Sequence, residues 1–279
     1  MSPMFSERLS FGGLGLRISG ETPWQQSPVC APFRTAVESA EHEIYVAISS
    51  ALPTPPENAA SSRGCYRWRC GAERHMLHDN SFNTSYSVTK GNVTELILSP
   101  HYAENLRTQL ILEEADLFDI LAERGMLVLH SSYVLRAEGD AILFSGVSGA
   151  GKSTQAELWR EFAAARVING DRSLVDVDRG MAHGIFYSGT SGICENHSAP
   201  IRAIVLPEQA GENSVTAAGH REAFMRLINQ CAYYPWDADS ASEMTELVAR
   251  LVGRVPVYRL RCRKDEGAVR ALENELRRE

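Results

Sequence analysis

Lysine is scarce in this chain of 279 residues: positions 90, 152 and 264 hold its only lysines, whereas lysine and arginine together number 28. Acidic residues number 35, so the net charge is −7. Nucleic-acid binding proteins usually carry a basic excess, and a membrane-spanning helix needs about twenty consecutive apolar residues. The sequence has neither feature, so we expect neither nucleic acid nor a membrane as a partner.

The sequence also shows no pattern typical of a leader segment or of a cysteine metal site. The N-terminus shows no charged stretch followed by an apolar one, which predicts a cytoplasmic protein. The six cysteines are scattered, and Cys65 and Cys70 have no second pair with which to complete a zinc site. We interpret all six as reduced thiols. The content of 44% hydrophobic and 23% charged residues is typical of one large or two modest globular domains.

The most informative segment that is present is residues 146–154, GVSGAGKST, which contains the pattern G-x-x-x-x-G-K-[S/T]. A short apolar run precedes it at 140–145 and a helical pattern follows at 154–165, so strand, loop and helix are expected in that order. Its glycines let backbone N–H groups surround phosphate oxygens, which predicts a phosphate site. The alternative interpretation is a glycine-rich turn that joins strand to helix and binds no ligand. We name this segment the phosphate loop. The residues predicted to bind ATP are Gly146, Val147, Ser148, Gly149, Ala150, Gly151, Lys152, Ser153 and Thr154.

Lys152 stands out because the chain otherwise uses arginine for nearly every positive charge. A compact ammonium fits inside a phosphate loop, whereas a planar guanidinium is too large. Asp171 ends a short apolar stretch 19 positions later. The Asp171 carboxylate and the Ser153 hydroxyl together would suit Mg²⁺. The alternative is that Asp171 only caps a turn after Gly170.

His130 follows an apolar run that leads towards the phosphate loop. A single histidine is more often structural than catalytic, but this placement makes His130 a candidate for the site. Residues 133–136 and 141–144 flank a turn, as the strands of a hairpin would, and a strand over 126–129 is expected to end at His130.

The first hundred residues differ from the rest. Short strands expected at 14–18, 43–48 and 94–98 are separated by Pro, Gly, Asn and Ser, and 52–63 is the best loop. A helix is predicted over 103–124, with Gly125 as its stop. We therefore expect an α/β protein with a β-rich N-terminal lobe at 1–120 and a nucleotide-binding domain at 121–279.

Across residues 121–206, the order of a histidine after a strand, a hairpin, a phosphate loop and an acid followed by arginine resembles the HPr kinase/phosphorylase catalytic domain. That family shares its fold with ATP-dependent phosphoenolpyruvate carboxykinases. The resemblance implies that His130 lines the active site and that Asp171 matches the second residue of the family's Asp-Asp-Arg. Gly170 stands where the first aspartate, the presumed general base, would be. The N-terminal lobe and the basic substrate loop of the bifunctional enzymes have no obvious match, so HPr itself is not the expected substrate.

The expected function is an ATP- and Mg²⁺-dependent kinase acting on a hydroxyl of a peptide, a protein or a small metabolite. Lys152, Asp171 and His130 are its expected catalytic residues, with His130 receiving the proton in place of the missing aspartate. The alternatives are an ATP-binding sensor or accessory protein and a carboxykinase-like lyase. The sequence leaves the oligomeric state open.

Three weaker candidates complete the set, each with an alternative. Residues 188–196 would close over the phosphates or merely connect two strands, and Arg202 would neutralise transferred charge or lie in solvent. A C-terminal basic cluster would contact nucleotide or form a charged outer face; it comprises Arg254, Arg259, Arg261, Arg263 and Lys264.

Overall fold

A computed structural model describes residues 4–80 and 83–278, and the chain is a mixed α/β protein of two compact units. Unit 1 comprises Met1–Ile120 and Tyr234–Ala241, and unit 2 comprises Leu121–Tyr233 and Ser242–Glu279. The sequence predicts residues 234–241 in the second domain, but they belong to unit 1. Within the described residues, no helix combines the length and apolar character needed to cross a membrane.

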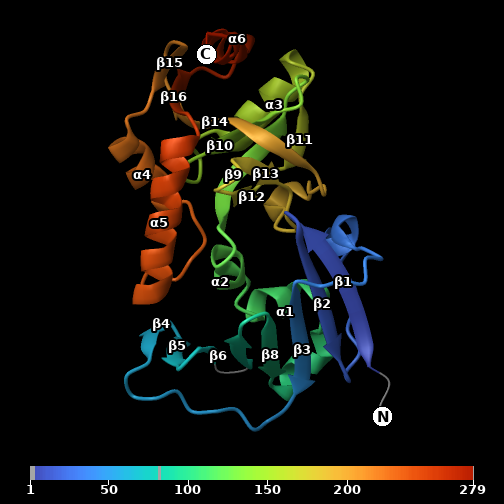
Figure 1. Ribbon diagram of the computed structural model, residues 1–279. Helices are drawn as coiled ribbons and strands as arrows, with labels where there is room; N and C mark the ends of the chain where they lie inside the picture. Colours follow the sequence, from blue (N-terminus) through green and yellow to red (C-terminus); the bar gives the residue numbers. More distant parts are fainter. Residues whose placement is uncertain (1–3, 81–82, 279) are drawn as a thin grey trace. The chain divides into compact units, whose positions relative to one another are not determined.

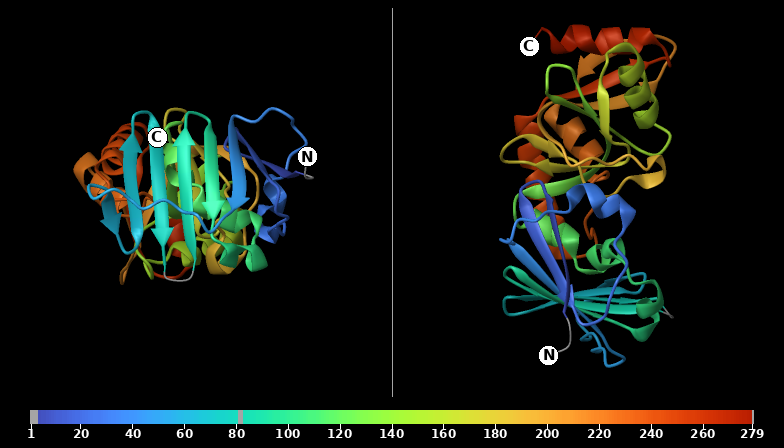
Figure 2. Two further views of the ribbon diagram at one scale, coloured as in Figure 1. Left: turned by 90° about the horizontal axis from the view of Figure 1, so that it is seen from below. Right: turned by 90° about the vertical axis from the view of Figure 1, so that its right-hand side faces the viewer.

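Unit 1 is built on an eight-stranded sheet in the order β1-β2-β3-β8-β7-β6-β5-β4, shown face on in Figure 2. The pairs β2–β3 and β3–β8 are parallel and the others antiparallel. Side chains alternate along β1 and β8, so Leu9 and Leu96 are fully buried between neighbours that are at least partly exposed. The strands are β1 (Phe5–Phe11), β2 (Leu14–Gly20), β3 (His42–Ile48), β4 (Ala60–Ser62), β5 (Cys65–Cys70), β6 (Glu73–Asp79), β7 (Thr84–Lys90) and β8 (Val93–Leu98).

The single helix predicted over residues 103–124 is wrong. The chain instead forms the 3-10 helix η2 (Pro100–Asn105), followed by the short helices α1 (Thr108–Glu114) and α2 (Leu117–Ala122). Another 3-10 helix, η1 (Pro28–Phe33), lies between β2 and β3. Between the two short helices Asp116 adopts φ +58°, a left-handed conformation. Its carboxylate accepts hydrogen bonds from Arg67 at 2.7 Å and Arg74 at 3.2 Å. Helical periodicity does not predict this pairing, because its partners lie far apart in the sequence.

Unit 2 holds the second sheet, in the order β10-β9-β12-β13-β14-β16-β15, with β11 also paired to β9 (Figure 1). Because β10 pairs with β14 as well, β9, β12, β13, β14 and β10 form a closed circuit of pairings. The pairs β10–β14 and β14–β16 are parallel. The strands are β9 (Met126–Leu135), β10 (Ala141–Ser145), β11 (Arg166–Asn169), β12 (Arg172–Asp176), β13 (Met181–His183), β14 (Ser198–Gln209), β15 (Ser214–Ala217) and β16 (Val257–Cys262).

Helices cover both faces of the central strands of unit 2, as the buried runs in β10 and β14 require. Ile142 and Phe144 pack with residues of α3 and α6, whereas Leu143 and Leu206 pack with residues of α4 and α5. The result is a three-layer arrangement around the parallel strands. The helices are α3 (Lys152–Phe162), α4 (His220–Ile228), α5 (Ala238–Arg254) and α6 (Glu266–Leu276), and η3 (Gly189–Ser191) is a 3-10 turn.

The strand, loop and helix expected around residues 146–154 are confirmed as β10, the phosphate loop and α3. The hairpin is also confirmed, with Ala141 opposite Leu135. The strand expected to end at His130 is a correction: β9 continues through His130 to Leu135, because its second half pairs with β10 and β11. His130 therefore lies in mid-strand, half-buried between buried neighbours.

Candidate functional site

The phosphate loop leaves the carboxyl end of β10, where parallel sheets commonly bind ligands. Gly149 and Gly151 adopt φ values of +80° and +103°, which favour glycine and turn the backbone before α3 begins at Lys152. The N-terminus of α3 follows this turn, so its free N–H groups and positive dipole end face the loop. The segment has the backbone form of an anion cradle.

Lys152 is buried, and its Nζ donates hydrogen bonds to the carbonyl oxygens of Gly146 at 2.8 Å and Val147 at 3.2 Å. Burial lowers the pKa of the ammonium, and the nearby Asp171 carboxylate opposes that shift. The lysine is thus folded over its own loop, where phosphate oxygens can exchange for the two carbonyls.

Asp171 lies in the turn between β11 and β12. The side-chain oxygen of Asn169, which is fully buried, accepts the N–H groups of Asp171 at 2.9 Å and Arg172 at 3.0 Å. The Asn169 amide in turn donates to Ile185 O at 2.6 Å. Asp171 therefore lies in a turn that the side chain of Asn169, and not its own carboxylate, caps. Sequence reasoning missed Asn169, although the Asn-Gly-Asp run marked the turn.

His130 faces Asp171 from the adjoining strand. Its Nε2 lies 3.6 Å from Asp171 Oδ1, and its Nδ1–H donates to Gln230 Oε1 at 3.3 Å. Since Nδ1 carries the proton, Nε2 of the neutral ring is left as a proton acceptor. Burial and then the charge of Lys152 lower the pKa of His130, with Asp171 acting in the opposite direction. Gln230 is 100 residues away in sequence, and no pattern marked it.

Residues 188–196, which were predicted either to close over the phosphates or to connect two strands, lie directly against Asp171. A Cβ at Gly189 would stand 2.6 Å from Asp171 Cγ, so only glycine permits this approach. A Cβ at Gly170 would overlap Ser191 Oγ and stand 2.6 Å from Ser191 Cβ. The η3 turn thus occupies the space into which an aspartate at position 170 would extend.

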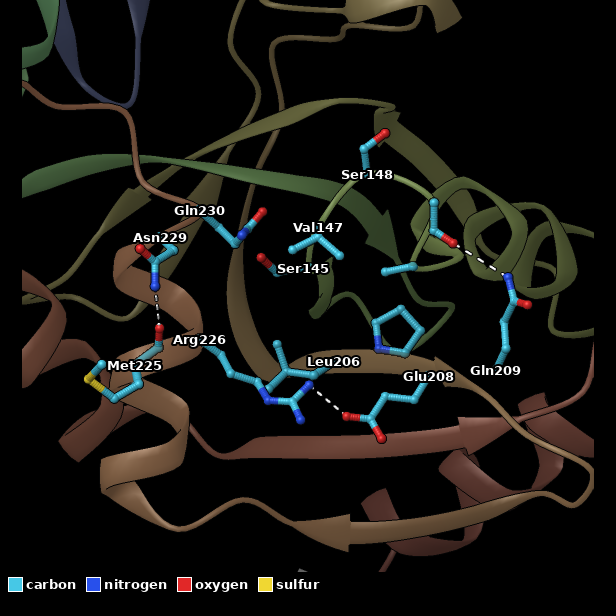
Figure 3. Close-up of a pocket in the computed structure, with 14 residues that line it drawn as sticks. Ser145, Val147, Ser148, Leu206, Glu208, Gln209, Met225, Arg226, Asn229 and Gln230 are labelled. Atoms are coloured by element: carbon cyan, nitrogen blue, oxygen red, sulfur yellow. Dashed lines mark hydrogen bonds and ion pairs between the residues drawn. The ribbon is translucent and has the colours of Figure 1, made fainter.

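Three cavities surround the phosphate loop. The His130 cavity, of about 340 Å³, is lined by His130, Lys152, Ser153, Thr154, Gly170 and Asp171. The Lys264 cavity, of about 410 Å³, includes Thr154, Gln155, Arg263 and Lys264. The Met225 cavity, of about 550 Å³, includes Val147, Met225 and Gln230 and is drawn in Figure 3. Gln209, whose amide donates to Gly149 O at 3.5 Å, lines all three.

The His130 cavity brings together the predicted catalytic residues and both predicted metal ligands. No cluster of three or more His, Cys, Asp or Glu side chains suited to a metal occurs in residues 4–80 and 83–278. A hydroxyl and one carboxylate are nevertheless hard oxygen donors, and Mg²⁺ in nucleotide sites typically takes few protein ligands besides phosphate and water. The residues present therefore fit a nucleotide-borne Mg²⁺ better than a metal held by the protein alone.

The weaker candidates from the sequence occupy different kinds of position in the structure. Arg202 donates a hydrogen bond to the carbonyl of Leu276 at the end of α6, a structural tie between β14 and that helix. Of the C-terminal basic cluster, Arg263 and Lys264 line the Lys264 cavity. Arg259 instead pairs with Glu222 at 3.6 Å, which fits a charged outer face.

No protein-family model matches this sequence, and no curated protein matches it either.

Proposed function

We propose that this protein is an ATP-dependent kinase, with a P-loop core of the HPr kinase and phosphoenolpyruvate carboxykinase type, that transfers a γ-phosphoryl group to a hydroxyl. One observation carries the proposal: the phosphate-loop lysine, a potential metal-binding pair and an acid–base pair share a single cavity. Phosphoryl transfer depends mainly on positioning and charge neutralisation, which these groups supply.

The phosphates would lie along the loop and the N-terminus of α3, with Lys152 near the β and γ phosphates. Ser153 and Asp171 would hold Mg²⁺, which neutralises charge on the phosphates when bound. Thr154 lines both the His130 cavity and the Lys264 cavity. A nucleotide with its γ-phosphate near Asp171 would therefore extend its nucleoside into the Lys264 cavity, beside Arg263.

In the proposed reaction the acceptor oxygen forms a bond to the γ-phosphorus, and the bond from that phosphorus to the β–γ bridging oxygen breaks. Its electron pair leaves with ADP. The hydroxyl proton passes to Nε2 of His130, which is the unprotonated nitrogen of the neutral ring because Gln230 accepts the Nδ1–H. Asp171, 3.6 Å away, stabilises the imidazolium that forms.

A specific observation favours a second candidate, an ATP-binding sensor. Position 170 lacks the family's aspartate, and Ser191 fills the adjacent space. A carboxykinase-like lyase has less support, because a carboxylate substrate needs a free cation. Among the described residues that line the Met225 cavity, Arg226 is the one base, and it already pairs with Glu208 at 2.6 Å.

The two candidates separate in an assay with γ-labelled ATP and Mg²⁺. The protein is incubated with fractionated small metabolites and, separately, with hydroxyl-bearing peptides. A kinase transfers label to a component of one pool, and the transfer is lost in Lys152→Ala. Binding of ATP without label in any pool would favour the sensor, and no binding of ATP would refute both.

A further inference from the structure

One wall of the Met225 cavity lies against His130. Gln230, which lines the cavity and is 91% buried, accepts the Nδ1–H of His130. Ser145, also in the wall, donates its hydroxyl hydrogen to His130 O at 3.0 Å. The backbone N–H of His130 donates to Gln230 O at 2.8 Å, which holds the wall against β9. Gln230 thus separates this cavity from the Nδ1 side of His130, and the cavity meets the His130 cavity at Ser148, Gly149 and Gln209, which line both.

The charges of this cavity are already neutralised. Among the described lining residues Glu208 is the one acid and Arg226 the one base, and they form the 2.6 Å ion pair drawn in Figure 3. Arg226 also lies 3.5 Å from Glu222. Neither charge is left for a ligand, and a charged ligand would lose hydration without gaining a partner. The cavity therefore favours an uncharged ligand.

Its walls are largely apolar. Val147 and Met225 are 66% and 56% exposed, which is unusual for side chains of this type, and both line this cavity with Leu206 and Pro207. Large apolar side chains left exposed around a concave surface mark a binding site. The volume of about 550 Å³ lies in the range of small-molecule pockets.

We infer that the Met225 cavity binds the phosphoryl acceptor, and that this acceptor is a small uncharged hydroxyl compound with an apolar body. The inference rests on the proposed kinase function and narrows its acceptor to one class. The apolar body lies between Val147 and Met225, and the hydroxyl points along Ser148 and Gly149, which line both cavities, to the His130 cavity. There its oxygen attacks the γ-phosphorus, its proton goes to His130, and ADP leaves with the bridging electron pair.

Three alcohols test this: 3-phenyl-1-propanol, its carboxylated counterpart 4-(3-hydroxypropyl)benzoate, and glycerol. Binding is measured by ligand-observed NMR in the presence of Mg²⁺ and a non-hydrolysable ATP analogue, and transfer is measured with γ-labelled ATP. We expect phenylpropanol to bind at least about tenfold more tightly than the other two and to accept label. Met225→Asp should weaken its binding at least about fivefold, with less than about twofold change in affinity for the analogue.

Phe162→Asp is the matched control, since Phe162 is 44% exposed at the end of α3 and outside the three cavities. It should leave both affinities unchanged. If the parent binds the analogue but does not prefer phenylpropanol, or labels a component of another pool but none of the alcohols, the acceptor assignment fails alone. An equal loss in Met225→Asp and Phe162→Asp would also overturn it. If the parent does not bind the analogue, the kinase proposal itself fails.

Discussion

Each unit gathers charged side chains in one place, but the two clusters differ in how fully their charges are matched. In unit 1, Arg67 contacts three carboxylates: Asp116 at 2.7 Å, Asp237 at 3.1 Å and Asp119. The Tyr234 ring covers its guanidinium at 4.0 Å. Arg67, Asp116 and Asp119 are at most 5% exposed. The charges of this cluster are therefore largely matched by one another.

The cluster in unit 2 is open. His130 and Asp171 are 30% and 34% exposed, and their ring nitrogen and carboxylate oxygen are 3.6 Å apart. The hydrogen bonds of Lys152 described above both go to carbonyl oxygens of its own loop. Similar residue types therefore stabilise the fold when they pair fully with one another. They are available for binding or catalysis when their pairing is incomplete.

The saturated cluster should show the largest effect on stability. Arg67→Met leaves buried carboxylates without their main partner, so we expect a loss of about 3–5 kcal/mol in the free energy of unfolding, measured with urea. Arg69→Met is the matched control, because the Arg69–Asp239 pair is exposed and should contribute at most about 1 kcal/mol. Equal effects of the two substitutions would contradict the distinction between the clusters.

In the open cluster, His130→Ala should lower phosphoryl transfer by about a hundredfold, equal to about 2.7 kcal/mol in the activation barrier, while ATP affinity stays nearly intact. Single-turnover transfer and equilibrium binding separate the two effects. Gly170→Asp should not rescue this variant, because its Cβ overlaps Ser191. The φ of Gly170 lies outside the left-handed region, so rescue becomes possible in Gly170→Asp with Ser191→Gly. Rescue by Gly170→Asp alone would show that the η3 turn does not block this position.

The pH dependence should follow His130. Burial and Lys152 lower its pKa below 6.5, and the ring accepts a proton only when neutral. We therefore expect kcat/KM to be level at neutral pH and to fall about tenfold per pH unit below an inflection that lies under 6.5. The inflection should disappear in His130→Ala. An inflection above 6.5 would contradict the lowered pKa of His130, and an inflection that persists in His130→Ala would mean that the imidazole is not the proton acceptor.

Asp171→Asn keeps the size and the turn while removing the carboxylate charge. We expect the Mg²⁺ concentration needed for half-maximal turnover to rise about tenfold, with unfolding near that of the parent. Superimposable magnesium titrations would limit Asp171 to its role in the turn.

The sequence predicted those parts of the site that depend on neighbouring residues. The strand, loop and helix around Lys152 follow from local periodicity and glycine placement, and the hairpin of β9 and β10 follows from its turn. Gln230 and Ser191 could not be predicted, because they reach His130 and Gly170 only through tertiary packing.

The same reason explains the misplaced helix. The break at Asp116 involves Arg67, whose partners Asp116, Asp119 and Asp237 lie 49, 52 and 170 residues away. Hydrophobic periodicity carries no record of such ion pairs.

Calorimetric titration of ATP with Mg²⁺ into the parent and into Lys152→Ala tests whether residues 146–154 bind nucleotide. Removing the ammonium deprives the β and γ phosphates of a point charge, so affinity should fall at least tenfold, about 1.4 kcal/mol. Circular dichroism checks that the variant is folded. A folded Lys152→Ala protein that binds ATP as tightly as the parent would contradict the assignment of residues 146–154 as a nucleotide site.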